Sequence, residues 1–207
     1  MIPRHTLRWT LLMLCSLLLA VLLIACGGGG TSATSTPTPT PMPTTPPSPT
    51  PPPLTTYTGS GYTIGYPQGW KVKTSSDGVT FTDPNGLAYV TVRTAPNPNG
   101  VVTTDTQTSL AIQVFKSSAK NEQKVDIAAT AMVGGDTWSQ QAATGDITPS
   151  GQSSPVNVKI VVLADNHPAN MPTTKAFVIG YATGTPLFDL ANTSVFQPIL
   201  QSFKFTS

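Results

Sequence analysis

Few side chains in this chain are suited to acid–base or nucleophilic chemistry. His167 is the only histidine beyond the apolar N-terminal segment, and Glu122 is the only glutamate. A Ser-His-Asp hydrolase would have to use His167, yet the sequence contains no Gly-x-Ser-x-Gly turn. Hydrolysis by paired carboxylates is the remaining route, and the pool of carboxylates for it is small. We therefore expect no enzymatic activity, with a weak hydrolase of cell-wall polymers as the alternative.

A metal site is the second kind of chemistry to consider. His167 lies in the sequence Asp165-Asn166-His167-Pro168, where neither a second histidine nor a cysteine is close by. Because metal sites need converging ligands, we expect a solvated turn with no metal and no cofactor. The alternative is a divalent-cation site, for which Asp77, Asp83 and Asp165 would have to converge.

Cys26 is the residue with the clearest predicted modification. The sequence Leu23-Ile24-Ala25-Cys26 ends an apolar run that follows Arg4 and Arg8. It resembles the lipobox of bacterial lipoproteins, which implies lipid attachment to Cys26, acyl chains such as palmitate, and cleavage between Ala25 and Cys26. We therefore expect residues 1–25 to be a signal peptide, with an uncleaved membrane anchor as the alternative. Either way the rest of the chain would lie on the extracytoplasmic face of the bacterial cell membrane.

Residues 26–56 have the composition of a linker. Glycines are followed by a stretch rich in Thr, Ser and Pro. Proline fixes the φ angle and donates no backbone hydrogen bond, so we expect an extended, disordered stalk. The only other cysteine, Cys15, lies in the signal segment, so the predicted domain at 57–207 has no disulfide.

The charge of the chain argues against nucleic-acid binding. The chain has 11 Lys and Arg against 9 Asp and Glu, and removal of residues 1–25 takes away Arg4 and Arg8, which leaves nine against nine. Nucleic-acid binding normally needs clustered basic side chains that neutralise phosphates, and the sequence has no such cluster.

Residues 57–207 contain the sequence patterns of both strands and helices. Strands are expected at 62–66, 70–74, 79–82, 87–94, 125–133, 137–143, 156–164 and 174–182. A helix is expected at 105–119 with Leu110, Ala111, Val114 and Phe115 on its buried face, and a last helix from Phe188 should be interrupted by Pro198. We expect Tyr62, Tyr66 and Trp70 to pack in the core rather than form a binding platform. The order predicts an α+β fold with an antiparallel sheet packed between helices.

Two motifs carry a family resemblance. YTIGYPQGW at 62–70 and ILQSFKF at 199–205 resemble the PsbP-like family, which includes the PsbP subunit of photosystem II, the Ran-binding Mog protein and bacterial lipoproteins. The resemblance covers about 57–207 and implies an α/β/α sandwich. It implies little about activity, and the metal-binding histidines of plant PsbP have no counterpart in this chain.

Together these features predict a lipid-anchored extracytoplasmic lipoprotein with a monomeric domain. Its role would be binding or envelope assembly without catalysis, with an envelope protein or a cell-wall ligand as partner. We expect that partner at the loops 83–86, 95–103 and 165–173, because long loops vary without disturbing a core.

Overall fold

The structure, a computed structural model, describes residues 52–149 and 153–206. Cys26, the predicted signal peptide and the predicted stalk up to residue 51 lie outside the described residues. The described residues belong to one compact unit, Pro47–Ser207. Within them, no helix has the length and apolar character needed to cross a membrane.

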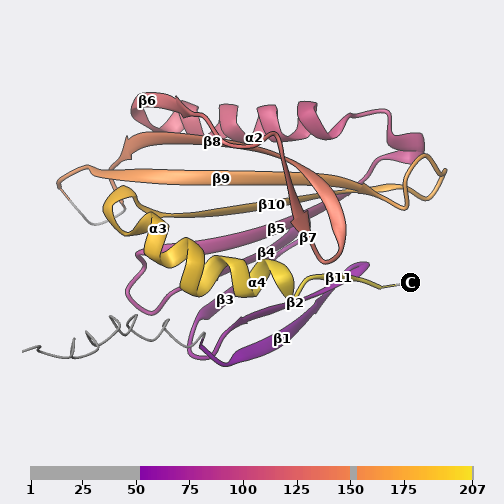
Figure 1. The fold of residues 1–207 in the computed structure, drawn as a ribbon, viewed down its shortest axis with the longest axis horizontal. Coiled ribbons are helices and arrows are strands. Elements are labelled where there is room, and N and C mark those ends of the chain that lie inside the picture. The colour runs from indigo at the N-terminus through magenta and orange to yellow at the C-terminus, as the bar shows by residue number, and fades with distance from the viewer. Residues whose placement is uncertain (1–51, 150–152, 207) are drawn as a thin grey trace, which may run out of the picture. The chain divides into compact units, whose positions relative to one another are not determined.

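An antiparallel sheet forms the centre of the domain (Figure 1). Its strand order is β3-β4-β5-β10-β9-β8-β6, and β7 pairs with β8 off this path. The strands are β3 (Lys71–Ser75), β4 (Gly78–Thr82), β5 (Ala88–Pro96), β6 (Lys120–Val125), β7 (Thr130–Val133), β8 (Asp136–Ile147), β9 (Val156–His167) and β10 (Lys175–Gly184). The alternation of apolar residues places one set of side chains on each face, so two separate cores form.

One face of this sheet is covered by a second, smaller sheet and by the C-terminal helical segment. The small sheet has the order β1-β2-β11, with β1 at Leu54–Gly59, β2 at Tyr62–Pro67 and β11 at Lys204–Phe205. The helical segment comprises the 3-10 turn Thr185–Leu187, α3 (Phe188–Ala191), a π turn (Asn192–Phe196) and α4 (Gln197–Gln201). The Ser202 hydroxyl accepts a hydrogen bond from the Gly65 amide at 2.7 Å, which ties this segment to β2.

The larger core lies between these layers and is rich in aromatic rings. Phe203 is fully buried and stacks on Tyr62 at 5.5 Å, and Trp138 of β8 meets it edge-on at 5.1 Å. The burial of Tyr62 confirms the prediction that this residue packs in the core. The core tryptophan, however, is Trp138, whereas Trp70 is only partly buried at the edge of the cluster because it ends the turn before the exposed edge strand β3.

The opposite face carries α2 (Thr104–Ser118), preceded by the short 3-10 helix Pro98–Gly100. α2 packs on β8 and β9 and reaches β10. Its buried contacts are Ile112 and Phe115, which lie over Ala143, Ile160 and Val162. This second core is smaller than the first, because one helix covers only part of the face.

The α+β class and the antiparallel sheet agree with the sequence expectations. The strand expected at 125–133 is instead two strands, β6 and β7, which pair with different parts of β8. The last helix is interrupted as expected: a π turn stands immediately before α4, and Pro198, which donates no backbone bond, lies in the first turn of α4. β1 begins at Leu54, inside the segment expected to be a linker, because its backbone pairs along the whole of β2.

Candidate functional site

The position of α2 is set by hydrogen bonds to one side of the sheet. Thr104 shares a hydroxyl–hydroxyl bond of 2.7 Å with Ser139, and Gln141 donates to the Ser109 hydroxyl at 2.9 Å. Both partners on the sheet belong to β8, and β8 lies near the β6 edge of the strand order. These bonds hold the helix over β8 and β9, so the same face of β5 and β4 is left without a helix above it.

A polar cluster fixes the N-terminal end of α2. Thr103 caps the helix by accepting from the Thr106 amide at 3.3 Å. The Gln107 and Asn97 side chains both donate to the Val102 carbonyl, at 2.9 and 2.8 Å. Each of these two side chains also donates to Asn166 of β9 at 2.8 Å. The loop before the helix is therefore bound to the sheet, and α2 is held at both its side and its start.

A groove lies between α2 and the uncovered part of the sheet, and we call it the α2 groove. Its volume is about 480 Å³, which falls within the range of about 300–1,000 Å³ typical of small-molecule pockets. It is lined by Ala111, Val114, Phe115 and Ser118 of α2, by Tyr89, Thr91 and Arg93 of β5, by Ile160 and Val162 of β9, by Val178 and Gly180 of β10, and by Ile147. The described residues that line it include no carboxylate.

α2 also carries large apolar side chains that neither core buries. Val114 lines the groove with 71% of its surface exposed, and Leu110, one turn earlier, is 53% exposed. The sequence placed both residues on the buried face together with Phe115. The structure shows that expectation to be wrong for Leu110 and Val114, because the bonds to β8 direct Ile112 and Phe115 inward instead.

Gly180 forms the floor of the groove at the centre of β10. It pairs with Thr91 of β5 on one side and with Val162 of β9 on the other. A Cβ atom at Gly180 would lie 3.2 Å from the Thr91 Cγ2 atom. Because Gly180 has no side chain, space remains above the sheet beside α2.

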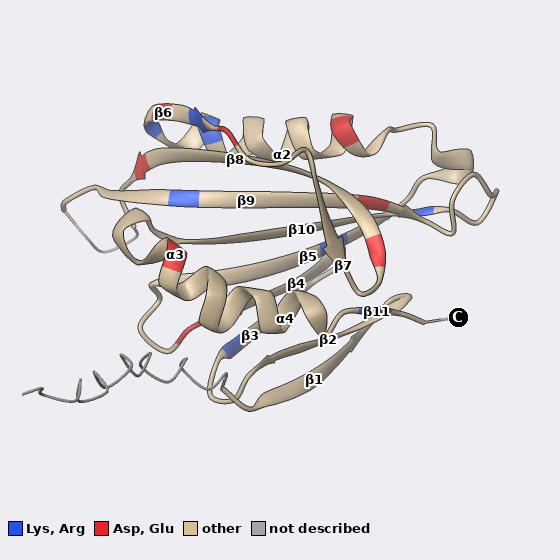
Figure 2. Cartoon of the chain, in the orientation of Figure 1, with Lys and Arg blue, Asp and Glu red and all other residues tan. Residues whose placement is uncertain are grey.

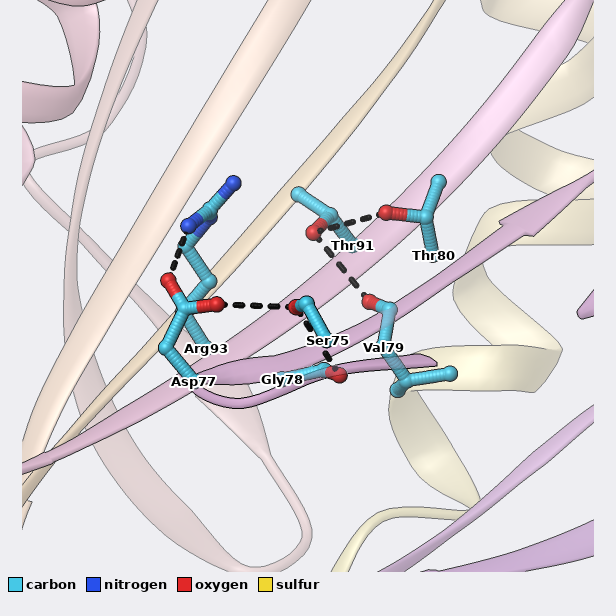
Figure 3. Close-up of polar contacts among 7 residues, drawn as sticks. All are labelled: Ser75, Asp77, Gly78, Val79, Thr80, Thr91 and Arg93. Atoms are coloured by element: carbon cyan, nitrogen blue, oxygen red, sulfur yellow. Dashed lines mark hydrogen bonds and ion pairs between the residues drawn. The ribbon is translucent and has the colours of Figure 1, made fainter. Parts of the chain in front are cut away.

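Beyond the groove, the same face of the sheet becomes polar (Figure 3). Thr80 of β4 donates to the Thr91 hydroxyl at 3.4 Å, and Thr91 donates to the Val79 carbonyl at 3.2 Å. Lys71 and Lys73 of β3 pair with Thr82 and Thr80, so they share this face. Charged segments are sparse across the large sheet as a whole (Figure 2).

Arg93 ends this polar region and is held by an ion pair with Asp77 (Figure 3). The Ser75 hydroxyl donates to Asp77 at 2.8 Å and, together with the charge of Arg93, holds the pKa of Asp77 below its usual value. Tyr89 lines the groove on the same strand, and burial raises its pKa, so its phenol stays neutral at pH 7. We call Lys71, Lys73 and Arg93 the basic strip.

A second cluster lies on the opposite face of the large sheet. Asp136 of β8 and Asp165 and His167 of β9 each offer one ligand atom, and these atoms lie within 4.8 Å of one another. Burial, with the nearby charge of Asp136, raises the pKa of Asp165. The His167 ring stacks on Phe205 at 3.7 Å, which fixes its plane. Carboxylate and imidazole donors of this kind suit a divalent cation.

The structure does not bring together Asp77, Asp83 and Asp165, the three aspartates considered as an alternative cation site. Asp77 and Asp83 lie in the turns at opposite ends of β4, and Asp165 lies in β9. Asp83 accepts amide bonds from Asn85 and Ala88 and so closes its turn. His167, expected to be a solvated turn residue, instead ends β9 as the third member of the Asp136 cluster.

Sequence reasoning missed the α2 groove and placed binding at the loops. Two signals in the sequence pointed to it. The helix at 104–118 has apolar residues over more than one face, and Gly180 interrupts an otherwise apolar strand. Neither signal says where the helix lies over the sheet, because that depends on the long-range bonds to β8.

Comparison with known proteins gives distant likenesses among solved structures. No family model matches the chain, and no curated protein matches it. Among solved structures, a protein of Bacteroides thetaiotaomicron has a TM-score of 0.41 and 8% identity over 70% of this chain, which spans 45% of that protein's length. LpqN, involved in cell envelope biogenesis of Mycobacterium tuberculosis, has a TM-score of 0.47 and 13% identity over 74% of this chain and 91% of its own.

Proposed function

We propose that this chain is an exported lipoprotein, anchored through Cys26, whose domain binds an apolar ligand in the α2 groove without catalysis. The domain would be a PsbP-like member by the motifs at 62–70 and 199–205. The observation that carries the proposal is the α2 groove itself, which has apolar walls on α2, β9 and β10 and a polar side on β5. Placement beside a membrane gives such a protein direct access to molecules with acyl chains.

The apolar surface in the groove is the source of the expected affinity. Burial of apolar area contributes roughly 25 cal/mol per Å². Val114, Val178 and Val162 present apolar side chains from three elements to the same space. A ligand that fills the groove would cover the exposed surface of Val114, which the fold leaves in water.

The test is photo-crosslinking of the full chain in phosphatidylcholine nanodiscs with a diazirine-bearing palmitate. Val114→Asp places a charge in the groove wall at an exposed position, so the fold is retained while apolar binding is lost. Leu110→Asp is the matched control, because it lies on the same helix and is exposed but does not line the groove. We expect Val114→Asp to lower the yield at least fivefold and Leu110→Asp to leave it unchanged. Equal yields from both variants would refute the proposal.

A second candidate function is cation binding at Asp136, Asp165 and His167, favoured by the convergence of their ligand atoms. Titration of the full chain with Mn²⁺ or Zn²⁺ in a calorimeter would test it. Asp165→Asn should abolish the saturable heat, and Asp126→Asn, an exposed aspartate outside the cluster, should not. Heat that is identical in the two variants would remove this candidate.

A further inference from the structure

The α2 groove and Lys73 of the basic strip lie on one row of the sheet, and Lys71 and Arg93 share its face on the neighbouring rows. Lys73 pairs with Thr80, Thr80 with Thr91, Thr91 with Gly180, and Gly180 with Val162. Residues paired in this way share one face, and neighbouring strands are about 4.8 Å apart, so the row spans roughly 19 Å. The row therefore changes from cationic through hydroxyl-bearing to apolar along a single line.

The polar end of this row has an excess of positive charge. Lys71 and Lys73 lie on the fully exposed strand β3, and neither takes part in an ion pair among the described residues. The Arg93 side chain is 61% exposed and pairs with Asp77, which among the described residues is the one acidic side chain paired with the basic strip. Three cations against one carboxylate favour an anion at this end.

We infer that the ligand of the α2 groove is a single-chain lipid whose head is a phosphate, with its acyl chain over Gly180 and Val162. This inference rests on the proposed function. Thr91 and Arg93 of β5 line the groove opposite α2, and Arg93 belongs to the basic strip, so a chain in the groove has its head directed along the row to Thr80 and Lys73.

Phosphate fits this end better than a carboxylate does. A phosphate monoester carries nearly two charges at pH 7 and three strong acceptor oxygens. Lys71 and Lys73 supply ammonium donors from β3. Arg93 adds a planar guanidinium that Asp77 holds in place, and guanidinium groups bind phosphate oxygens in pairs.

Competition crosslinking of the full chain in phosphatidylcholine nanodiscs tests the inference. The probe is a diazirine-bearing lysophosphatidate, and the competitors are lysophosphatidate, palmitate and lysophosphatidylcholine of equal chain length, and inorganic phosphate. The test variant is the double substitution Lys71→Ala and Lys73→Ala. Its matched control is Lys120→Ala with Lys124→Ala on β6, the exposed strand at the opposite edge of the same sheet.

With the wild-type chain, lysophosphatidate should compete about tenfold better than palmitate or lysophosphatidylcholine, and this preference should shrink as salt is raised. The Lys71/Lys73 variant should lose the preference but keep labelling by the palmitate probe, and the Lys120/Lys124 variant should keep both. Equal competition by all three lipids would overturn the head-group inference while leaving the groove intact. Competition by inorganic phosphate alone would show an anion site without a chain, and no labelling by any probe would refute the proposed function itself.

Discussion

Phe203→Ala should be among the most destabilising single substitutions in the domain. Phe203 is fully buried, where it stacks on Tyr62 and meets Trp138 and Phe177 edge-on at 5.1 and 6.4 Å. It joins the small sheet to the large one, so the cavity left by its removal lies between two rigid layers that cannot easily close. Truncation of a buried phenylalanine costs about 3–5 kcal/mol of unfolding free energy. For a chain of this size that lowers the Tm by roughly 6–20 °C.

Thermal unfolding of the full chain in a mild detergent, followed by near-ultraviolet circular dichroism, measures this effect. Leu190→Ala is the control, because Leu190 lies in the neighbouring helix α3 and is 64% exposed, and surface substitutions usually change stability by less than about 0.5 kcal/mol. A Phe203→Ala shift no larger than that of Leu190→Ala would show that the two sheets are not joined through this ring.

Four further outcomes follow from the sequence and the structure. Cys26→Ser should abolish labelling of the chain by a palmitate analogue in cells, and undiminished labelling would end the lipobox interpretation. Gly134→Ala should cost about 1–3 kcal/mol more than Gly135→Ala in denaturant titration, because both have positive φ but only a Cβ at Gly134 would clash with the Phe203 carbonyl oxygen; equal losses would contradict this. Burial raises the pKa of Tyr181 to about 12, so its contribution to stability is complete below pH 10 and is lost as the pH rises from 10 toward 12; Tyr181→Phe should flatten the alkaline loss of Tm, and an unchanged profile would refute this. Purified chain should show no saturable turnover of peptidoglycan, polysaccharide or ester substrates, and turnover that disappears with Glu122→Gln would overturn the non-catalytic reading.

The local pattern of the chain was enough to predict most of its elements. Alternation identified β2, β4 and β5, whose core-facing residues recur every second position, whereas β9 and β10 were visible as apolar runs because both of their faces lie in cores. β6 was misplaced because its residues KNEQKV are polar on both faces, as suits the exposed edge of a sheet. β1 was assigned to the linker because its Thr-rich sequence follows a run of prolines and gains its order from pairing with β2.

The candidate sites depend on contacts that a linear pattern does not contain. Asp136 and His167 are far apart in the sequence and meet because the β8–β9 register brings their ends together. The α2 groove exists because Thr104 and Ser109 bind β8 and hold the helix off the centre of the sheet. Both features depend on strand register and on contacts between distant parts of the chain. The sequence therefore showed which residue types were present but not that they come together.

The position of cross-links from a diazirine-bearing acyl probe on the wild-type chain tests the groove most directly. After tryptic digestion and mass spectrometry, we expect the labelled residues to fall in the peptides 94–116, 160–175 and 176–204, which carry Val114, Val162 and Val178 of the lining. Within the first of these, the label should centre on residues 111–115. Labels confined to β6, to the C-terminal helical segment or to the loops at 95–103 and 165–173 would contradict binding in the α2 groove.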